Sequence, residues 1–300
     1  MEASNMLKTK KFNLFLGLLL QMLYVTSNQA DHQLIWNGEQ YDKNSSLQYK
    51  IGMQAVESFN LRGDECVLDI GCGNGKITAL CADRLTSGSL IAIDNSSDMI
   101  DFANKNYENH TNITFLLQDV TTMCFEQEFD FLYSIFCLHW VKDQDTALHN
   151  IAKSLKPGGK AILYIALPNA FNTLFKDTFN TIINSPSWNY YKDILSYNHF
   201  PIPKELWFDY AKQCDLEIVD FQIIQDDVTY VTCDQFKQRF TAYGVGADIL
   251  HSMGEELGNR FIDYYLTIVY TALGLTADQP ITRKSDGLVL VLKKPASYFC

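Results

Sequence analysis

The sequence predicts an α/β fold: a doubly wound, mostly parallel sheet of seven strands, with a helical cap inserted in its C-terminal half. Three observations indicate this fold. A short apolar strand at 66–70 runs into a glycine-rich turn and then into a helix. Up to residue 166, short β-branched runs alternate with helical segments, which is typical of βαβ units. Beyond residue 168, aromatic residues at helical spacing interrupt the alternation.

The strands are recognised as short apolar runs, and the helices as amphipathic segments that end at turn signals. Phe171, Phe175 and Phe179 lie on one face of a helix in the cap, because they recur every four residues. The Lys-Pro-Gly-Gly segment at 156–159 predicts a turn between a helix and a strand. We expect strands at 66–70, 89–94, 113–117, 129–135, 160–166, 216–225 and 287–292, and helices at 54–61, 76–85, 97–107, 144–155, 234–240 and 255–273.

The composition is typical of a globular domain without a nucleic-acid partner. Hydrophobic residues make up 47% of the 300 residues, and 24 basic against 35 acidic residues give a net charge of −11. Phosphate binding needs clustered Lys and Arg, so this charge disfavours nucleic acid. The eight cysteines form no C-x-x-C pair, which favours reduced thiols and disfavours a structural metal site. We expect residues 31–300 to form one domain, in which 168–283 contribute a substrate cap.

The glycine-rich turn narrows the class of ligand. Asp69 ends the first strand, and Gly71, Gly73 and Gly75 follow at two-residue spacing. A phosphate loop needs a Ser or Thr where Ile77 stands, and the dinucleotide fingerprint has a different glycine spacing. The pattern Asp-x-Gly-x-Gly-x-Gly resembles the first motif of class I methyltransferases, which have a Rossmann-like fold and use S-adenosylmethionine. In that family the loop wraps the amino-acid end of the cofactor.

Two further acids follow the next two strands. Asp94 ends the second strand, where an acidic side chain can accept hydrogen bonds from both ribose hydroxyls. The resemblance implies that Asp119, after the third strand, accepts from the adenine amino group. Each acid alone could cap a helix, but three at successive strand ends indicate one pocket. The resemblance adds Asn95, Val120 and Phe136 to the expected cofactor-binding residues.

A second set of motifs resembles a narrower group, the small-molecule carboxyl methyltransferases, which include the juvenile hormone acid and trans-aconitate enzymes. The resemblance runs from about residue 36 to residue 295 and implies that Gln48 and Trp140 hold a substrate carboxylate. An amide and an indole N–H are neutral donors, so they orient the carboxylate without neutralising it. The aromatic cap suits a hydrophobic acid of the juvenile hormone acid or farnesoic acid type. The motifs are Tyr41 with Gln48, Cys-Leu-His-Trp-Val at 137–141, Leu-Lys-Pro-Gly-Gly at 155–159 and Ser-Pro-x-Trp at 185–188.

Other functions remain open at this point. A carboxylate is already ionised near neutral pH, so esterification by in-line displacement requires no base. If the acceptor is instead a hydroxyl or amine, His139 is the candidate general base. A third hypothesis is a non-catalytic binding protein with the same fold. The identity of the acid and the oligomeric state are not determined by the sequence.

The N-terminal 30 residues have the layout of a targeting segment. Three lysines at 8–11 precede the apolar run 12–25, and small residues follow up to Ala30. The segment is interpreted as a cleaved signal peptide, as a weak anchor that brings 12–25 to a membrane, or as an incorrectly assigned start. The cytosolic origin of S-adenosylmethionine and the expected reduced thiols favour the cytoplasm.

Overall fold

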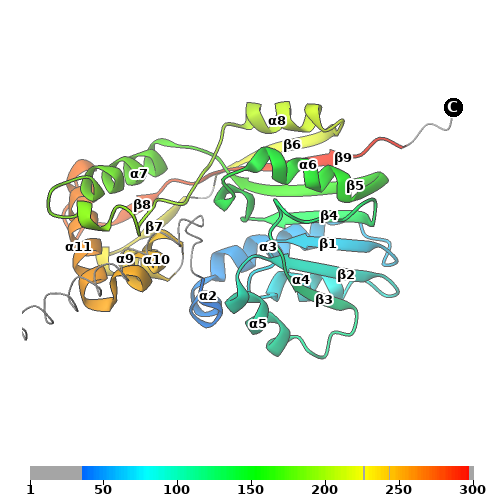
Figure 1. Cartoon of the computed structure of the whole chain (residues 1–300), viewed down its shortest axis with the longest axis horizontal. Helices are drawn as coiled ribbons and strands as arrows, with labels where there is room; N and C mark the ends of the chain where they lie inside the picture. The colour runs from blue at the N-terminus through cyan, green and yellow to red at the C-terminus, as the bar shows by residue number, and fades with distance from the viewer. Residues whose placement is uncertain (1–35, 226, 243, 297–300) are drawn as a thin grey trace, which may run out of the picture. The chain divides into compact units, whose positions relative to one another are not determined.

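The computed structural model describes residues 36–225, 227–242 and 244–296, and a single sheet organises most of them (Figure 1). In sheet order, the first five strands are parallel to one another, and the sixth is antiparallel to both of its neighbours. The expected doubly wound, mostly parallel sheet is therefore confirmed. The strands lie in the order β3 (Ile113–Leu117), β2 (Ser89–Asp94), β1 (Cys66–Ile70), β4 (Phe129–Ile135), β5 (Leu155–Ala166), β9 (Asp286–Lys293) and β6 (Glu217–Gln225).

Helices cover both faces of this sheet because alternate residues of each strand point to opposite sides. Leu68 and Ile70 of β1 belong to a core that α6 and α8 cover, whereas Val67 belongs to a core shared with α3, α4 and α5. These helices are α3 (Ser46–Ser58), α4 (Lys76–Ala82), α5 (Ser97–Asn106), α6 (Gln144–Ser154) and α8 (Lys204–Gln213), and the short α2 (Gly38–Asn44) precedes them.

The remaining elements form a separate aromatic core. Phe175, Phe179, Phe261 and Tyr265 are almost fully buried in it, and the Tyr265 hydroxyl donates a 2.9 Å hydrogen bond to the Phe175 carbonyl. The expected cap segment is interrupted, because β6 and α8 lie within 168–283 but pack with the sheet. The separate core contains α7 (Ala170–Ile183), α9 (Cys233–Thr241), α10 (Val245–Met253), α11 (Glu255–Ala272) and the strand pair β7 (Val228–Tyr230) and β8 (Ile281–Arg283).

Several boundaries differ from the sequence prediction. The helix expected at 54–61 begins at Ser46, and α2, α8 and α10 were not predicted. The turn expected at 156–159 lies inside β5, which begins at Leu155. There the backbone continues to pair: the Gly158 N–H donates to Lys294, and the Lys294 N–H donates to Gly159, each at 2.9 Å. Pairing with the chain beyond β9 therefore extends the strand through a sequence that has local turn propensity.

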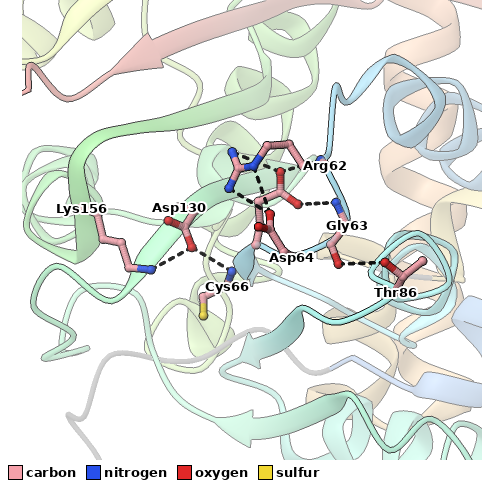
Figure 2. Close-up of polar contacts among 8 residues, drawn as sticks. Arg62, Gly63, Asp64, Cys66, Thr86, Asp130 and Lys156 are labelled. Carbon is pink, nitrogen blue, oxygen red and sulfur yellow. Dashed lines mark hydrogen bonds and ion pairs between the residues drawn. The ribbon is translucent and has the colours of Figure 1, made fainter.

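Polar contacts hold the amino ends of β1 and β4 (Figure 2). The buried Glu65 carboxylate accepts a 2.9 Å hydrogen bond from the Gly63 N–H. Asp130 accepts from the Cys66 N–H at 2.9 Å and from Lys156 Nζ at 2.8 Å. Burial alone would raise the pKa of Asp130, but these donors lower it below its usual value. The carboxyl ends of the strands, at the opposite edge, are left for the residues expected to bind ligands.

The expected targeting segment, residues 1–30, lies outside the described residues. Within 36–225, 227–242 and 244–296, no helix is both long enough and apolar enough to cross a membrane.

Candidate functional site

The glycine turn lies at the carboxyl end of β1 and is shaped by close packing. Gly71 has a φ of 75°, and a Cβ built on it would lie 2.3 Å from the Cys137 side chain. The backbone N–H groups of Gly71 and Cys72 donate to the Ile93 carbonyl, which joins the turn to the end of β2. At Gly73, the Tyr41 ring at 3.8 Å is the one side chain of the described residues that a Cβ would meet. The turn is thus packed on one side and open at Gly73.

Asp69 is buried beneath this turn. Its Oδ2 atom accepts hydrogen bonds from Thr78 Oγ1 at 2.7 Å and from the Tyr133 hydroxyl at 2.9 Å. Burial raises the pKa of Asp69 to about 7; the two hydrogen bonds oppose the rise, and the charge of Asp94 adds to it. A cation placed beside Asp69 would favour its ionised form.

The acids after β2 and β3 are tied to the backbone. The two oxygens of Asp94 accept from the Gly73 and Ser96 N–H groups, each at 2.9 Å. Burial raises the pKa of Asp94 despite these bonds, and the charge of Asp119 acts in the same direction. Asp119 in turn accepts from Asn95 Nδ2 at 3.1 Å. The charge of Asp94 thus acts on Asp69 and that of Asp119 on Asp94, and a cationic ligand nearby would relieve this repulsion.

Two cavities open at this edge of the sheet, and they share the side chains of Tyr41 and Gln48. The smaller one is lined by the acid and glycines of the turn, among them Asp69, Gly71 and Gly73. The larger one is lined mainly by aromatic and aliphatic residues of the second core and its neighbours. Its lining includes Trp36, Tyr41, Leu47, Ile51, Phe136, Trp140, Phe171, Phe175, Tyr197, Ile224, Tyr230, Phe236, Phe240 and Val245.

Five of the residues expected at the cofactor line neither cavity: Gly75, Asp94, Asn95, Asp119 and Val120. Val120 is 5% exposed and packs in the core beneath α6. Gly75 is the N-cap of α4, and a Cβ on it would meet Ala103 and Tyr107 at 3.0 Å. Phe136 has a φ of 56°, a strained value for a residue with a side chain, and lines the larger cavity.

Gln48 lies between the two cavities and is held by a residue that the sequence prediction missed. Arg239 of α9 donates from Nη2 to Gln48 Oε1 at 2.8 Å and from Nη1 to the Asn44 carbonyl. An arginine can only donate, so it selects the amide orientation in which Gln48 Nε2 points away from it. Residues 191 positions apart make this contact, and no local pattern in the sequence could indicate it.

Trp140 ends a single turn of 3₁₀-helix at Leu138–Trp140 and lines the larger cavity. Its ring packs edge-on against the ring of Trp36, and the two ring centroids are 5.3 Å apart. The centroid of the His199 ring lies 4.8 Å from that of Trp140. A Cβ on Gly244 would lie 2.8 Å from the Trp140 ring. These contacts fix the position of the indole at the cavity wall.

His139 is buried beside Trp140. Its Nδ1 atom accepts a 3.2 Å hydrogen bond from the Ala166 N–H, so the neutral ring carries its proton on Nε2. Burial lowers the pKa of His139 well below its usual value, and the charges of His199 and Arg283 lower it further.

The chain matches proteins that share one kind of domain. Residues 67–159 match the family described as "Methyltransferase domain". The chain carries a class I methyltransferase domain. Its cofactor is S-adenosylmethionine, and both expectations are confirmed. The fit is physical as well: the open turn at Gly73 and the coupled acids suit a ligand with an adenosyl group and a positively charged sulfonium.

Several curated proteins are similar to this chain over a longer stretch than the family match covers. Protein 235L of Invertebrate iridescent virus 6, named as a methyltransferase, is 28% identical over 65% of this chain and 71% of its own length. Juvenile hormone acid O-methyltransferase of Bombyx mori is 27% identical over 51% of this chain and 57% of its own. Other relatives are named malonyl-[acyl-carrier protein] O-methyltransferase and trans-aconitate 2-methyltransferase. The similarity to some of these relatives thus spans little more than half of their length.

The fold of the methyltransferase domain also agrees with solved structures. The YcgJ protein of Bacillus subtilis superposes with a TM-score of 0.57 and is 15% identical in sequence. The superposition covers 83% of this chain and 100% of the YcgJ chain. At this identity the likeness concerns the fold alone.

Proposed function

We propose that the protein transfers a methyl group from S-adenosylmethionine to the carboxylate of a hydrophobic small-molecule acid, of the juvenile hormone acid or farnesoic acid type. The observation that carries the proposal is the place of Gln48, whose side chain lines both cavities. Arg239 fixes its Oε1 atom, which leaves the Nε2 donor for a ligand. The names of the relatives support an acid as acceptor, because they include a juvenile hormone acid O-methyltransferase, a malonyl-[acyl-carrier protein] O-methyltransferase and a trans-aconitate 2-methyltransferase.

Trp140 is the second donor in this proposal. Its ring lines the larger cavity, and the indole N–H donates to no other side chain within the described residues. Two neutral donors can hold a carboxylate by one oxygen each while its charge stays available for attack. The aromatic lining of the larger cavity suits the apolar part of the acid.

The reaction then needs little beyond orientation and the exclusion of water. With the cofactor bound, the carboxylate oxygen would attack the methyl carbon in line with the sulfur–methyl bond that breaks. S-Adenosylhomocysteine would leave, and the opposite charges would be neutralised as the ester forms. A cavity that excludes water favours this step, because it solvates the separated charges poorly. When bound, S-adenosylmethionine supplies the activated methyl group; Gln48 and Trp140 orient the acceptor.

The competing proposal, with His139 as a general base, receives less support. The Nδ1 lone pair of His139 already accepts a hydrogen bond from the Ala166 N–H. Nε2, which carries the proton, can act only as a donor in this tautomer. We therefore expect His139 to support the turn that carries Trp140 and not to remove a proton from the substrate.

The test is methyl transfer from labelled S-adenosylmethionine to a panel of carboxylic acids. We expect Gln48→Ala and Trp140→Ala to lower kcat/KM at least tenfold, with unchanged affinity for S-adenosylhomocysteine measured by calorimetry. Full activity in both variants would show that the carboxylate is held elsewhere. His139→Gln is the control for the base hypothesis, and its complete inactivity with intact folding would favour a hydroxyl or amine acceptor. Failure of the wild-type protein to bind either form of the cofactor would favour the non-catalytic hypothesis.

A further inference from the structure

Arg283 is a cation on the inner face of a strand. It ends β8, in which Ile281 is 1% exposed, Thr282 is exposed and Arg283 is half-buried. Alternate residues of a strand share a face, so Arg283 lies on the same face as Ile281, which packs into the aromatic core. Arg283 also lines the larger cavity. An anionic partner would stabilise an arginine at such a position, because removing its charge from water is costly.

The chain itself provides no partner for this charge among the described residues. No carboxylate there lies within 4.0 Å of the Arg283 guanidinium, and its buried Nε donates no hydrogen bond. The next residue, Lys284, is paired with Asp227, and the Asp286 carboxylate accepts from Gln225 at 3.0 Å.

The side chains around Arg283 do not neutralise it. Burial lowers the pKa of His199 to about 4, and the charges of Arg283 and Lys176 contribute. The pKa of His139 falls for the same main reason, so both imidazoles are uncharged near neutral pH. Among the described residues, Arg283 thus has no ion-pair partner on this wall of the cavity, although the Asp286 carboxylate and Arg239 line the same cavity.

We propose that Arg283 binds a second carboxylate of the substrate, so that the preferred acceptor is a dicarboxylic acid with an apolar chain between its two acid groups. This inference rests on the proposed methyl transfer to a carboxylate, and it replaces the monocarboxylic acids of the juvenile hormone acid or farnesoic acid type with a dicarboxylic acceptor. Gln48 and Trp140 hold the carboxylate that is methylated, and Arg283 holds the other. A monocarboxylic acid of equal length would cover the guanidinium with hydrocarbon and leave the charge buried without an anion.

The experiment compares matched acids on the full-length protein. Saturated α,ω-dicarboxylic acids of six to sixteen carbons, the monocarboxylic acids of the same lengths and the monomethyl esters of the diacids are offered with labelled S-adenosylmethionine. Binding to the protein loaded with S-adenosylhomocysteine is followed by calorimetry. We expect the best diacid to exceed the monoacid and monoester of its length at least tenfold in kcat/KM and in affinity.

The variants identify the residue responsible. Arg283→Met should reduce this preference for the diacid at least tenfold, and Arg283→Lys should restore part of it. Arg260→Met, which removes an exposed cation from α11, should keep the full preference. If Arg283→Met does not fold, the wild-type series and the Arg283→Lys variant test whether Arg283 causes the preference for the diacid.

The outcomes separate the two proposals. If monoacids are methylated and diacids are no better, or if Arg283→Met keeps the preference, the role of Arg283 is refuted and the proposed function stands. If neither the acids of the series nor farnesoic acid are bound or methylated, the proposed function fails, and the second carboxylate site fails with it.

Discussion

Replacing Asp69 with asparagine tests whether the buried carboxylate lowers the free energy of unfolding of the cofactor-free protein. Ionised Asp69 is buried next to Asp94, and its pKa rises from 3.8 to about 7. The asparagine side chain stays neutral at every pH, and its Oδ1 atom can accept the hydrogen bonds from Thr78 and Tyr133 that Asp69 Oδ2 now accepts. We expect the variant to be more stable than the wild type above neutral pH when no cofactor is bound.

The magnitude follows from proton linkage. Because the folded pKa of Asp69 lies above the unfolded value, its favourable contribution is complete below about pH 4 and is lost as the pH rises through 7. Between pH 5 and pH 8 the loss is about 3 kcal/mol in the free energy of unfolding. His139 and His199 act in the opposite direction, since their lowered pKa values make stability increase as pH rises through about 6.5. The informative quantity is therefore the difference between variant and wild type.

Urea unfolding of the cofactor-free protein at pH 5, 6, 7 and 8 measures this difference. We expect the stability of Asp69→Asn relative to wild type to increase by about 3 kcal/mol across the series. Asp64→Asn, at an acid with a side chain 62% exposed, is the control and should give a flat difference. A flat difference for Asp69→Asn as well would refute the account of a carboxylate destabilised by burial.

Three further outcomes are expected. Gly71→Ala should cost about 2 kcal/mol more than Gly158→Ala in urea unfolding, because both have positive φ but only Gly71 faces a side chain, that of Cys137, at 2.3 Å; equal costs would contradict this. Gly244→Ala should push the Trp140 ring from its place, where the new Cβ would lie 2.8 Å away, and lower kcat/KM for the acid with unchanged S-adenosylhomocysteine affinity. Under the proposed function, unaltered kinetics in Gly244→Ala would mean that the indole position is not critical. Affinity for S-adenosylmethionine, measured by calorimetry, should fall below pH 7 as Asp69 is protonated, and more than affinity for uncharged S-adenosylhomocysteine.

The sequence determined the fold and the cofactor because their signals are local. The strand at 66–70, the glycine spacing and the acids at 94 and 119 depend on short-range periodicity and on backbone geometry at one turn. In a parallel sheet, the carboxyl ends of neighbouring strands meet at one edge. Local order along the chain therefore fixes which residues meet at that edge. The same reasoning failed at 156–159, where pairing with a distant strand extended β5 through an apparent turn.

Only the tertiary structure decided the charge and orientation of the groups in the larger cavity. Arg239 reaches Gln48 across 191 residues, and Arg283 comes from a short strand that no sequence pattern indicated. The sequence argument expected an apolar pocket because the cap is aromatic, yet two arginines line the larger cavity. The tautomer of His139 likewise depends on a backbone N–H 27 residues away. Each of these depends on which side chains meet when separate layers pack, and the periodicity of a single segment carries no information about that.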